Sequence, residues 1–184
     1  LIGVQSGLKI GGMGELAQYV RDNPGKATFS SSGVGSIAHL ATEQWLQEIG
    51  GSAIHVPYQG ISPAVVGAVS GEVQFVFSDA AVVAPMAMSE RVTPLLVGGN
   101  QRFEQFPSVP SASEQGLGNL MLTTWYGLFG PKGLPPEIVE KLNSDLAAII
   151  ESKEVSDQLK SRYMTPVAGS PEDFRKVLKG EYDK

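Results

Sequence analysis

The sequence predicts an α/β fold with a mostly parallel sheet flanked by helices. From residue 27 onward, strand and helix patterns alternate at short intervals, which favours strands joined by helical crossovers. The segment 73–77 is mostly apolar, as is typical of a strand that is buried on both faces of a parallel sheet. The helical segments between the strands begin and end at recognisable cap residues, so the alternation has clear boundaries.

The first two thirds of the chain contain the predicted strands of the sheet and the helices that join them. The strands are expected over 27–31, 53–57, 73–77 and 92–98, and the helices over 36–49, 62–71 and 80–89. In the first of these helices Ile37, Leu40 and Trp45 recur on one face, and Gly50 follows as a stop signal. In the second, Pro63 occupies a favoured first-turn position. These patterns allow the helices to cover the sheet with their apolar faces.

The remainder is predicted to contain a loop, one more strand and three helices. The segment 100–118 is rich in Pro, Ser and Gln and contains a short helix at 111–115. A crossover strand is expected over 122–129. Pro136 opens a long helix with apolar residues at helical spacing, and two shorter helices follow. Ser170 is the expected N-cap of the last one, because a proline and two acidic residues come directly after it.

Composition and charge exclude several classes of function. The chain has 184 residues, a formal net charge of -5, two histidines and no cysteine. The acidic balance argues against nucleic-acid binding, since no basic face is available to neutralise phosphates. Without cysteine there is no thiolate chemistry and no disulfide framework, and we expect no metal site and no cofactor. No apolar run reaches the length of about 20 residues that a membrane-spanning helix needs.

The most informative segment is 30–36, in which a serine-rich strand end passes through Gly33 and Gly35 into a helix. The first N–H groups of a helix have no intrahelical partner, and the helix dipole places about half a positive charge there. Glycine also lets the backbone come close to a ligand. Because the segment carries no lysine or arginine, we expect it to bind a weakly charged anion, such as a carboxylate, through backbone N–H groups and serine hydroxyls.

This segment has three other interpretations. A dinucleotide site needs an acidic residue at the end of the next strand, where this chain has His55-Val56-Pro57-Tyr58. A nucleotide phosphate loop requires a closing Gly-Lys-Ser or Gly-Lys-Thr, which the chain lacks. In the third interpretation the glycines only allow a tight turn between strand and helix. That interpretation stays open beside the carboxylate site.

Candidates for catalysis are few. The chain has no Gly-x-Ser-x-Gly nucleophile motif. His39, in the first turn of its helix, is either a hydrogen-bonding helper at the anion site or a packing residue. His55 lies on a strand and is expected to be structural. Asp79 follows the strand at 73–77, where it is placed either to contact a ligand or to cap the next helix.

Three motifs follow one another along the chain. They are Ser30-Ser31-Ser32-Gly33-Val34-Gly35-Ser36 with His39-Leu40, then His55-Val56-Pro57-Tyr58-Gln59-Gly60, then Gly71-Glu72-Val73-Gln74-Phe75. In order and spacing they resemble the solute receptors of tripartite tricarboxylate transporters, also called the Bug family. The resemblance continues through Trp125-Tyr126-Gly127-Leu128 and covers essentially the whole chain. Gln59 stands where the family often has lysine, which removes one cation from the rim of the site.

The resemblance implies a receptor with two α/β lobes, similar to type II periplasmic binding proteins, that closes on a small carboxylate and delivers it to a membrane permease. It implies a periplasmic monomer with no enzyme activity. Residues 1–10 would be a segment between the lobes, 11–123 the ligand-binding second lobe, and 124–184 the crossover strand and C-terminal helices of the first lobe. We expect the rest of the first lobe and an export signal to lie outside this sequence, which begins at Leu1.

Carried onto this chain, the ligand contacts of the family fall on the glycine segment and on the ends of two neighbouring strands. The expected ligand-binding residues are Ser32, Gly33, Gly35, Ser36, His39, Tyr58, Gln59, Gly60, Ser78 and Asp79. Two alternatives stay open. One is an α/β enzyme that acts on a small carboxylic acid with Asp79 and His39. The other is a lobe that binds no ligand by itself.

Overall fold

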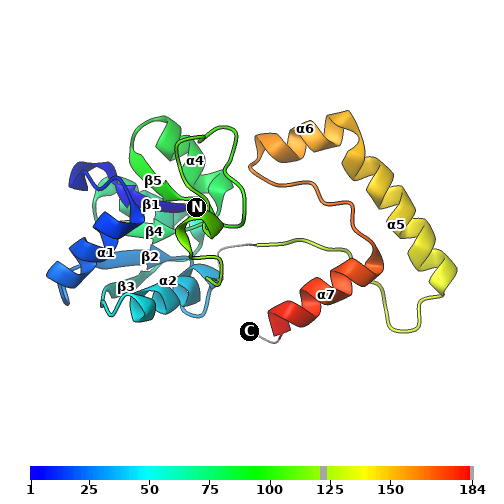
Figure 1. Cartoon of the computed structure of the whole chain (residues 1–184), viewed down its shortest axis with the longest axis horizontal. Coiled ribbons are helices and arrows are strands. Elements are labelled where there is room, and N and C mark those ends of the chain that lie inside the picture. The colour runs from blue at the N-terminus through cyan, green and yellow to red at the C-terminus, as the bar shows by residue number, and fades with distance from the viewer. Residues whose placement is uncertain (121–123, 183–184) are drawn as a thin grey trace. The chain divides into compact units, whose positions relative to one another are not determined.

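A computed structural model of the chain describes residues 1–120 and 124–182. The chain divides into two compact units, Leu1–Thr124 and Trp125–Lys184 (Figure 1). The first unit contains a sheet with helices on both faces, and the described part of the second contains helices and connecting segments. The α/β class predicted from the sequence is therefore confirmed, and the sheet belongs to the first unit.

The sheet of the first unit has the strand order β3-β2-β4-β1-β5. Its strands are β1 (Ile2–Gln5), β2 (Thr28–Ser31), β3 (Ile54–Pro57), β4 (Phe75–Phe77) and β5 (Val92–Leu96). β2 pairs in parallel with β3 and β4, whereas β1 pairs antiparallel with β4 and β5. All strands except β1 therefore run in one direction. This agrees with the predicted mostly parallel sheet, although β1 makes it a mixed one.

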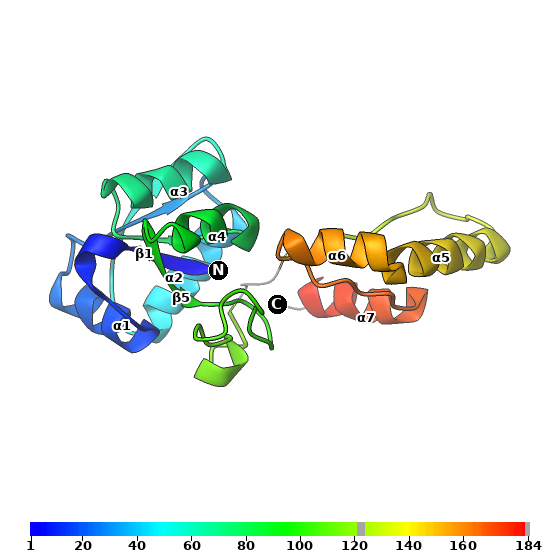
Figure 2. The ribbon, with the colours of Figure 1, turned by 90° about the horizontal axis from the view of Figure 1, so that it is seen from above.

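Helices cover both faces of this sheet (Figure 2). They are α1 (Met13–Asp22), α2 (Ile37–Glu48), α3 (Ile61–Ser70) and α4 (Ala80–Met88), with short 3-10 helices η1 (Ser6–Leu8) and η2 (Ser113–Gln115). On the face covered by α1 and α2, Phe29, Trp45 and Phe75 are almost completely buried. On the face covered by α3 and α4, Ser30 donates a hydrogen bond from its hydroxyl to the carbonyl oxygen of Ala64 at 2.7 Å. The alternation of side chains along β2 thus fills both layers.

The strands and helices predicted between residues 27 and 98 are confirmed, with boundaries that shift by one or two residues. Three elements before them were not predicted: β1, η1 and α1. β1 lies between β4 and β5 inside the sheet, so residues 1–10 contribute a central strand. Their assignment to a segment between two lobes stays a prediction.

A long connection follows β5 and is held by polar contacts. Arg102 Nε lies 2.9 Å from Glu114 Oε2, and the N–H of Ser111 donates to the same oxygen at 2.7 Å. These hydrogen bonds lower the pKa of Glu114 to about 2, and the bond from Arg102 has a larger effect than the bond from Ser111. Arg102 Nη1 also donates to the carbonyl oxygen of Pro107 at 2.7 Å. The connection is therefore cross-linked by its own side chains, although η2 is its only described helix.

The crossover strand predicted over 122–129 is absent from the described part of this range. Residues 124–129 have no regular secondary structure. A strand needs a neighbour to complete its backbone hydrogen bonds, and no described strand pairs with these residues. Residues 122 and 123 lie outside the described residues. Two aromatic residues of this segment, Trp125 and Phe129, instead pack with Phe174 of the second unit.

The second unit contains α5 (Pro136–Glu151), α6 (Lys153–Ser161) and α7 (Pro171–Tyr182), as the sequence predicts. Ser170 caps α7, since its hydroxyl accepts a hydrogen bond from the N–H of Asp173 at 3.1 Å. Trp125, Phe129 and Phe174 form an aromatic cluster with ring centroids 5.2 to 6.4 Å apart. Neither α5 nor α6 buries a residue.

Candidate functional site

The predicted site residues gather at one edge of the sheet, which we call the carboxyl edge because β2, β3 and β4 all end there. The parallel register places Ser31 beside Pro57 and Ser30 beside Val76, so the three strands end side by side. The segments that follow them are 32–36, 58–60 and 78–79. The structure therefore brings together all three predicted segments, at the position where ligands bind in open α/β sheets.

Each of these segments leads into a helix, so three helix N-termini lie at the carboxyl edge. α2, α3 and α4 begin at Ile37, Ile61 and Ala80. Ser36 caps α2, because its hydroxyl accepts a hydrogen bond from the N–H of His39 at 3.3 Å. Among the described residues, no hydrogen bond is formed by the N–H groups of Ile37 and Ala38. Two donors at the start of α2 are thus open to a ligand.

The segment 32–36, which we call the serine–glycine loop, holds its two glycines in conformations with φ of 135° at Gly33 and 79° at Gly35. A side chain would strain both positions. The glycine N–H groups already have partners, however. Gly33 donates to the hydroxyl of Ser31 at 3.2 Å, and Gly35 donates to Nδ1 of His39 at 3.1 Å. Any ligand bound by these two N–H groups must therefore replace a contact within the chain.

His39 and His55 form a stacked pair of imidazoles directly behind the serine–glycine loop. Their ring centroids lie 4.0 Å apart with an interplanar angle of 20°, and the His55 ring also stacks on Phe29 at 4.9 Å. Nε2 of His55 lies 2.7 Å from the hydroxyl of Ser31. The pKa of His55 is lowered, mainly by burial and to a smaller extent by the neighbouring His39, while Glu43 acts in the opposite direction. The sequence predicts a structural His55, but the structure links it to the loop through Ser31.

Sequence reasoning missed this link because it depends on the register of β2 and β3. Phe29 lies beside His55 in that register, so both side chains point to the α2 face of the sheet. His39 reaches the same place from the first turn of α2. The sequence carried one sign of this pair. His39 comes four residues after Gly35, and the next strand contains His55.

The structure separates the side chain of Tyr58 from the serine–glycine loop. Its ring lies against α3, where a Cβ added to Gly67 would overlap the Tyr58 hydroxyl. The pKa of Tyr58 is raised to about 12, mainly by burial and to a smaller extent by the neighbouring Glu72. Gln59 is exposed, and Gly60 is the N-cap of α3 with φ of 119°. This segment therefore offers backbone groups and the Gln59 amide at the carboxyl edge, rather than a phenol.

Ser78 and Asp79 lie at the end of β4. The N–H of Ser78 donates to the carbonyl oxygen of Leu1 at 3.0 Å, which leaves its side chain as the available group. Asp79 is the N-cap of α4, but its side chain makes no capping bond and instead accepts a hydrogen bond from the Thr124 hydroxyl at 3.4 Å. Within the described residues, His39 and Asp79 form no hydrogen bond or ion pair with each other. The structure thus provides no direct contact for a catalytic pair.

The charge of the carboxyl edge is unusual for an anion site. The segments 31–39, 58–62 and 78–82 contain no lysine and no arginine, and Asp79 is their only carboxylate. Positive potential at this edge therefore comes from the helix N-termini and their open N–H groups, and from histidine when it is protonated.

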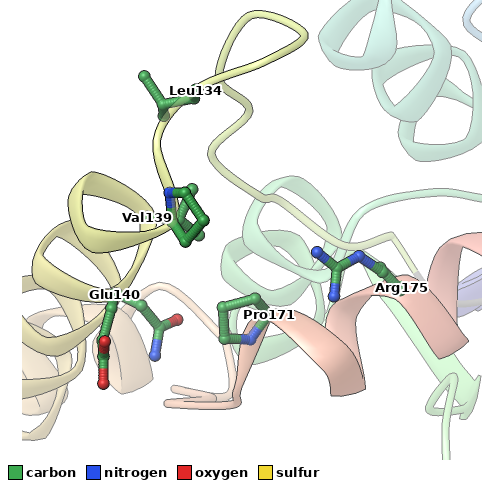
Figure 3. A pocket seen from close by; sticks show the side chains of 7 residues that line it. Leu134, Val139, Glu140, Pro171 and Arg175 are labelled. Carbon is green, nitrogen blue, oxygen red and sulfur yellow. The ribbon is translucent and has the colours of Figure 1, made fainter.

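A separate hollow lies in the second unit, between α5 and α7 (Figure 3). It has a volume of ≈ 440 Å³ and is lined by Leu134, Pro136, Val139, Glu140, Asn143, Pro171 and Arg175. Its one cation, Arg175, is paired with Glu172 at 3.1 Å. None of the predicted site residues lines this hollow.

Metal ligands and membrane-spanning helices are both missing from the described part of the chain. No three side chains of His, Cys, Asp or Glu come close enough together there to hold a metal ion. None of the helices among the same residues has the length and apolar character required to span a bilayer.

Comparison with known proteins assigns the fold and the family. The sequence profile of the tripartite tricarboxylate transporter family receptor matches residues 3–184. A protein of Pseudomonas sp. (strain P51), described as a UPF0065 protein in the tcbD-tcbE intergenic region, is 34% identical over 171 residues. The aligned region is 92% of this chain and 51% of that protein, so the chain spans about half the length of this relative.

Two solved structures share the fold over nearly the whole chain. The structure described as R. palustris Rpa4515 with adipate has a TM-score of 0.85 and 27% sequence identity, and the match covers 98% of this chain and 60% of that one. A structure described as a periplasmic transporter has a TM-score of 0.86 and 27% identity, over 100% of this chain and 61% of that one.

Proposed function

Because the chain belongs to the tripartite tricarboxylate transporter receptor family, whose members are receptors and not enzymes, we propose that the protein captures a small carboxylate in the periplasm and delivers it to a membrane permease. The observation that carries this proposal is the meeting of three helix N-termini at one sheet edge that has no lysine or arginine. The adipate in a structural neighbour supports the same ligand class.

The donors at this edge suit a receptor that must release its ligand. Backbone N–H groups and hydroxyls bind a carboxylate without the bidentate hold of an arginine, so the affinity is moderate and the ligand can leave. Ser36, Ser32 and the open N–H groups of Ile37 and Ala38 are the first contacts in this proposal. Ser78 and Gln59 contribute from the neighbouring strand ends.

The proposed receptor acts as a monomer that closes on its ligand. In this proposal Leu1–Thr124 is the ligand-binding lobe, and the helices of Trp125–Lys184 belong to the opposite lobe. Contacts that form only when both lobes meet the ligand would stabilise the closed arrangement, which is closure by a shift of population. The permease would then recognise the closed form.

A thermal-shift screen of carboxylates tests the proposal. The panel contains adipate, malate, citrate and a monocarboxylate, and the sample is the mature protein as its gene encodes it. At least one carboxylate is expected to raise the Tm, because a ligand that binds only the folded state stabilises it. Ser36→Ala should reduce that rise, because it removes a proposed ligand contact. The rise is measured from the variant's own Tm without ligand, because the variant also loses a helix cap.

Ser70→Ala is the matched control. Ser70 ends α3 and donates from its hydroxyl to the carbonyl oxygen of Gly67 at 3.1 Å, at the far end of α3 from the carboxyl edge. This variant should keep the full ligand-induced rise. If no carboxylate in the panel changes the Tm, the protein binds none of these ligands and the proposal is wrong.

A further inference from the structure

The imidazole pair, His39 and His55, carries an inference that rests on the proposed function and goes beyond it. In the structure Nδ1 of His39 accepts a hydrogen bond from the N–H of Gly35 at 3.1 Å. Nδ1 is therefore unprotonated, and the single ring proton of the neutral imidazole is on Nε2. A second proton on Nδ1 would face the Gly35 N–H, and the two donors would repel each other.

An anion at the serine–glycine loop changes this balance. A carboxylate oxygen that enters between Gly35 and His39 can accept a hydrogen bond from the Gly35 N–H and another from a protonated Nδ1. The direct bond from the Gly35 N–H opposes protonation of Nδ1, whereas the contact with the carboxylate would require it. The proton comes from solvent and binds at Nδ1, so no other reactant is needed.

We propose that His39 takes up one proton on Nδ1 when a carboxylate binds at the start of α2, so that its imidazolium supplies the positive charge that the serine–glycine loop lacks. The receptor then binds its ligand together with a proton. His39 is a ligand-contacting group in this proposal, and His55 is a positioning residue.

No group packed around His39 accepts a hydrogen bond from its ring within the described part of the chain. From α2, Glu43 Oε1 lies 3.8 Å from Nε2 of His39, beyond hydrogen-bond distance. From β3, His55 stacks on the ring with centroids 4.0 Å apart. β2 contributes Phe29 and Ser31, which do not titrate in this range. No other charged side chain among the described residues forms an ion pair with His39.

His55 holds the loop without needing a proton change. Ser31 can donate its hydroxyl hydrogen to the carbonyl oxygen of Gly33 at 3.0 Å while it accepts from the Gly33 N–H at 3.2 Å. Its remaining lone pair then accepts from Nε2 of His55, which lies 2.7 Å away. All hydrogen-bonding groups of Ser31 are satisfied in this arrangement. The proton that accompanies the ligand is therefore assigned to His39.

Isothermal titration calorimetry with adipate as the probe tests the proposal. Measurements in buffers of different ionisation enthalpy give the number of protons taken up on binding. For the mature protein as its gene encodes it, uptake should approach about one proton near neutral pH, with affinity falling up to about tenfold per pH unit as the pH rises. The sign follows because the adipate complex would hold one more proton than the free protein, so binding is favoured at low pH and weakens as the pH rises.

His39→Gln and His55→Gln separate the two roles. In His39→Gln the amide oxygen of the introduced side chain can still accept the Gly35 N–H but takes up no proton, so binding should lose its proton uptake and its pH dependence. His55→Gln keeps His39 and should therefore keep the proton uptake. Proton-detected NMR titration of the wild-type His39 ring, with and without adipate, gives the same test without a substitution.

The outcomes distinguish this inference from the proposed function. Adipate binding without proton uptake, or uptake that persists in His39→Gln, overturns the inference and leaves the receptor function intact. If adipate fails to bind at any pH between about 5 and 8, the titration is repeated with the carboxylate that gives the largest thermal shift. Failure of every carboxylate in the panel overturns both.

Discussion

The two units of this chain differ in what they bury. In Leu1–Thr124 large side chains such as Phe75, Phe77 and Leu16 are at most 1% exposed, whereas α5 and α6 in Trp125–Lys184 bury no residue. The second unit leaves a set of large apolar side chains 42 to 52% exposed: Ile138, Leu142, Ile149 and Val177. Since apolar burial is the main stabilising contribution to folding, the first unit has a hydrophobic core of its own, whereas the described part of the second unit has none.

This difference bears on how the receptor is organised. Helices with one apolar face need another surface to cover it, and in isolation such helices are marginally stable. We propose that the apolar faces of α5 and α7 pack against the remainder of the opposite lobe in the mature protein. The contrast between the units can be tested by experiments whose expected effects run from large to small.

Separating the units should give the largest effect. A fragment of residues 1–124 is expected to unfold cooperatively, whereas a fragment of residues 125–184 should show weak helicity and no cooperative transition, because its helices lack a buried core. Circular dichroism with thermal melts measures both. A sharp unfolding transition of the 125–184 fragment would contradict the contrast.

Truncation of one side chain in each unit gives the second effect. Phe75→Ala removes a ring that contacts Phe29, Trp45 and Phe77, and we expect a loss of about 3–5 kcal/mol of unfolding free energy. Leu142→Ala is the counterpart in α5, where the side chain is 42% exposed, and it should cost less than about 1 kcal/mol in this chain.

Denaturant titration measures the loss of unfolding free energy in both variants. In the mature protein as its gene encodes it, the cost of Leu142→Ala should rise if the opposite lobe covers α5. Equal costs for Phe75→Ala and Leu142→Ala in the 184-residue chain would show that the two units do not differ in burial.

Two glycine substitutions test packing inside the first unit. A Cβ at Gly67 would overlap the buried hydroxyl of Tyr58, so Gly67→Ala should destabilise by about 1–3 kcal/mol. Gly14 lies in α1 with nothing within 4 Å of an added Cβ. Gly14→Ala should therefore stabilise by up to about 1 kcal/mol, because alanine has the higher helix propensity. Chemical denaturation measures both changes in unfolding free energy, and we expect them to have opposite signs.

The smallest expected effect is the pH dependence of the ligand-free lobe. Because burial lowers the pKa of folded His55 below its ordinary 6.5, the unfolded state binds the proton more tightly. The free energy of unfolding should therefore decrease as the pH falls below 6.5 and level off below the folded-state pKa. His55→Gln should remove this part of the slope. A slope that His55→Gln leaves unchanged would assign the effect to another group.

The sequence predicted those elements whose signals are local. α2 has an N-cap serine, apolar residues at helical spacing and a glycine stop, and it was found within one residue at each end. β1 was not predicted, because Ile2-Gly3-Val4-Gln5 carries no long pattern and is stabilised by pairing with β4 and β5, which are distant in sequence. The predicted strand at 122–129 was wrong in its described part, where Trp125 and Phe129 pack with Phe174 and no strand pairs with the segment.

The same division applies to the site. Parallel strands end at a common edge, so the sequence placed Ser36, Gln59 and Asp79 together correctly. It could not show that the Gly35 N–H is already bound by His39, or that His39 stacks on His55, because both depend on strand register and side-chain rotamers. The ligand roles of the predicted residues stay a proposal.

In the proposed receptor, open N–H groups at the start of α2 bind the carboxylate, and a proline substitution at this position tests their role. Ile37 is the first helical residue, where proline is tolerated, and Ser36 has φ of -66° and ψ of 156°, which suit a residue before proline. Ile37→Pro therefore deletes one donor and keeps the helix, while Ile37→Ala removes the same side chain and keeps the donor. In calorimetric titrations with the best-binding carboxylate of the panel, we expect Ile37→Pro to bind about tenfold more weakly than Ile37→Ala. Equal affinities of the two variants, with α2 intact by circular dichroism, would contradict it.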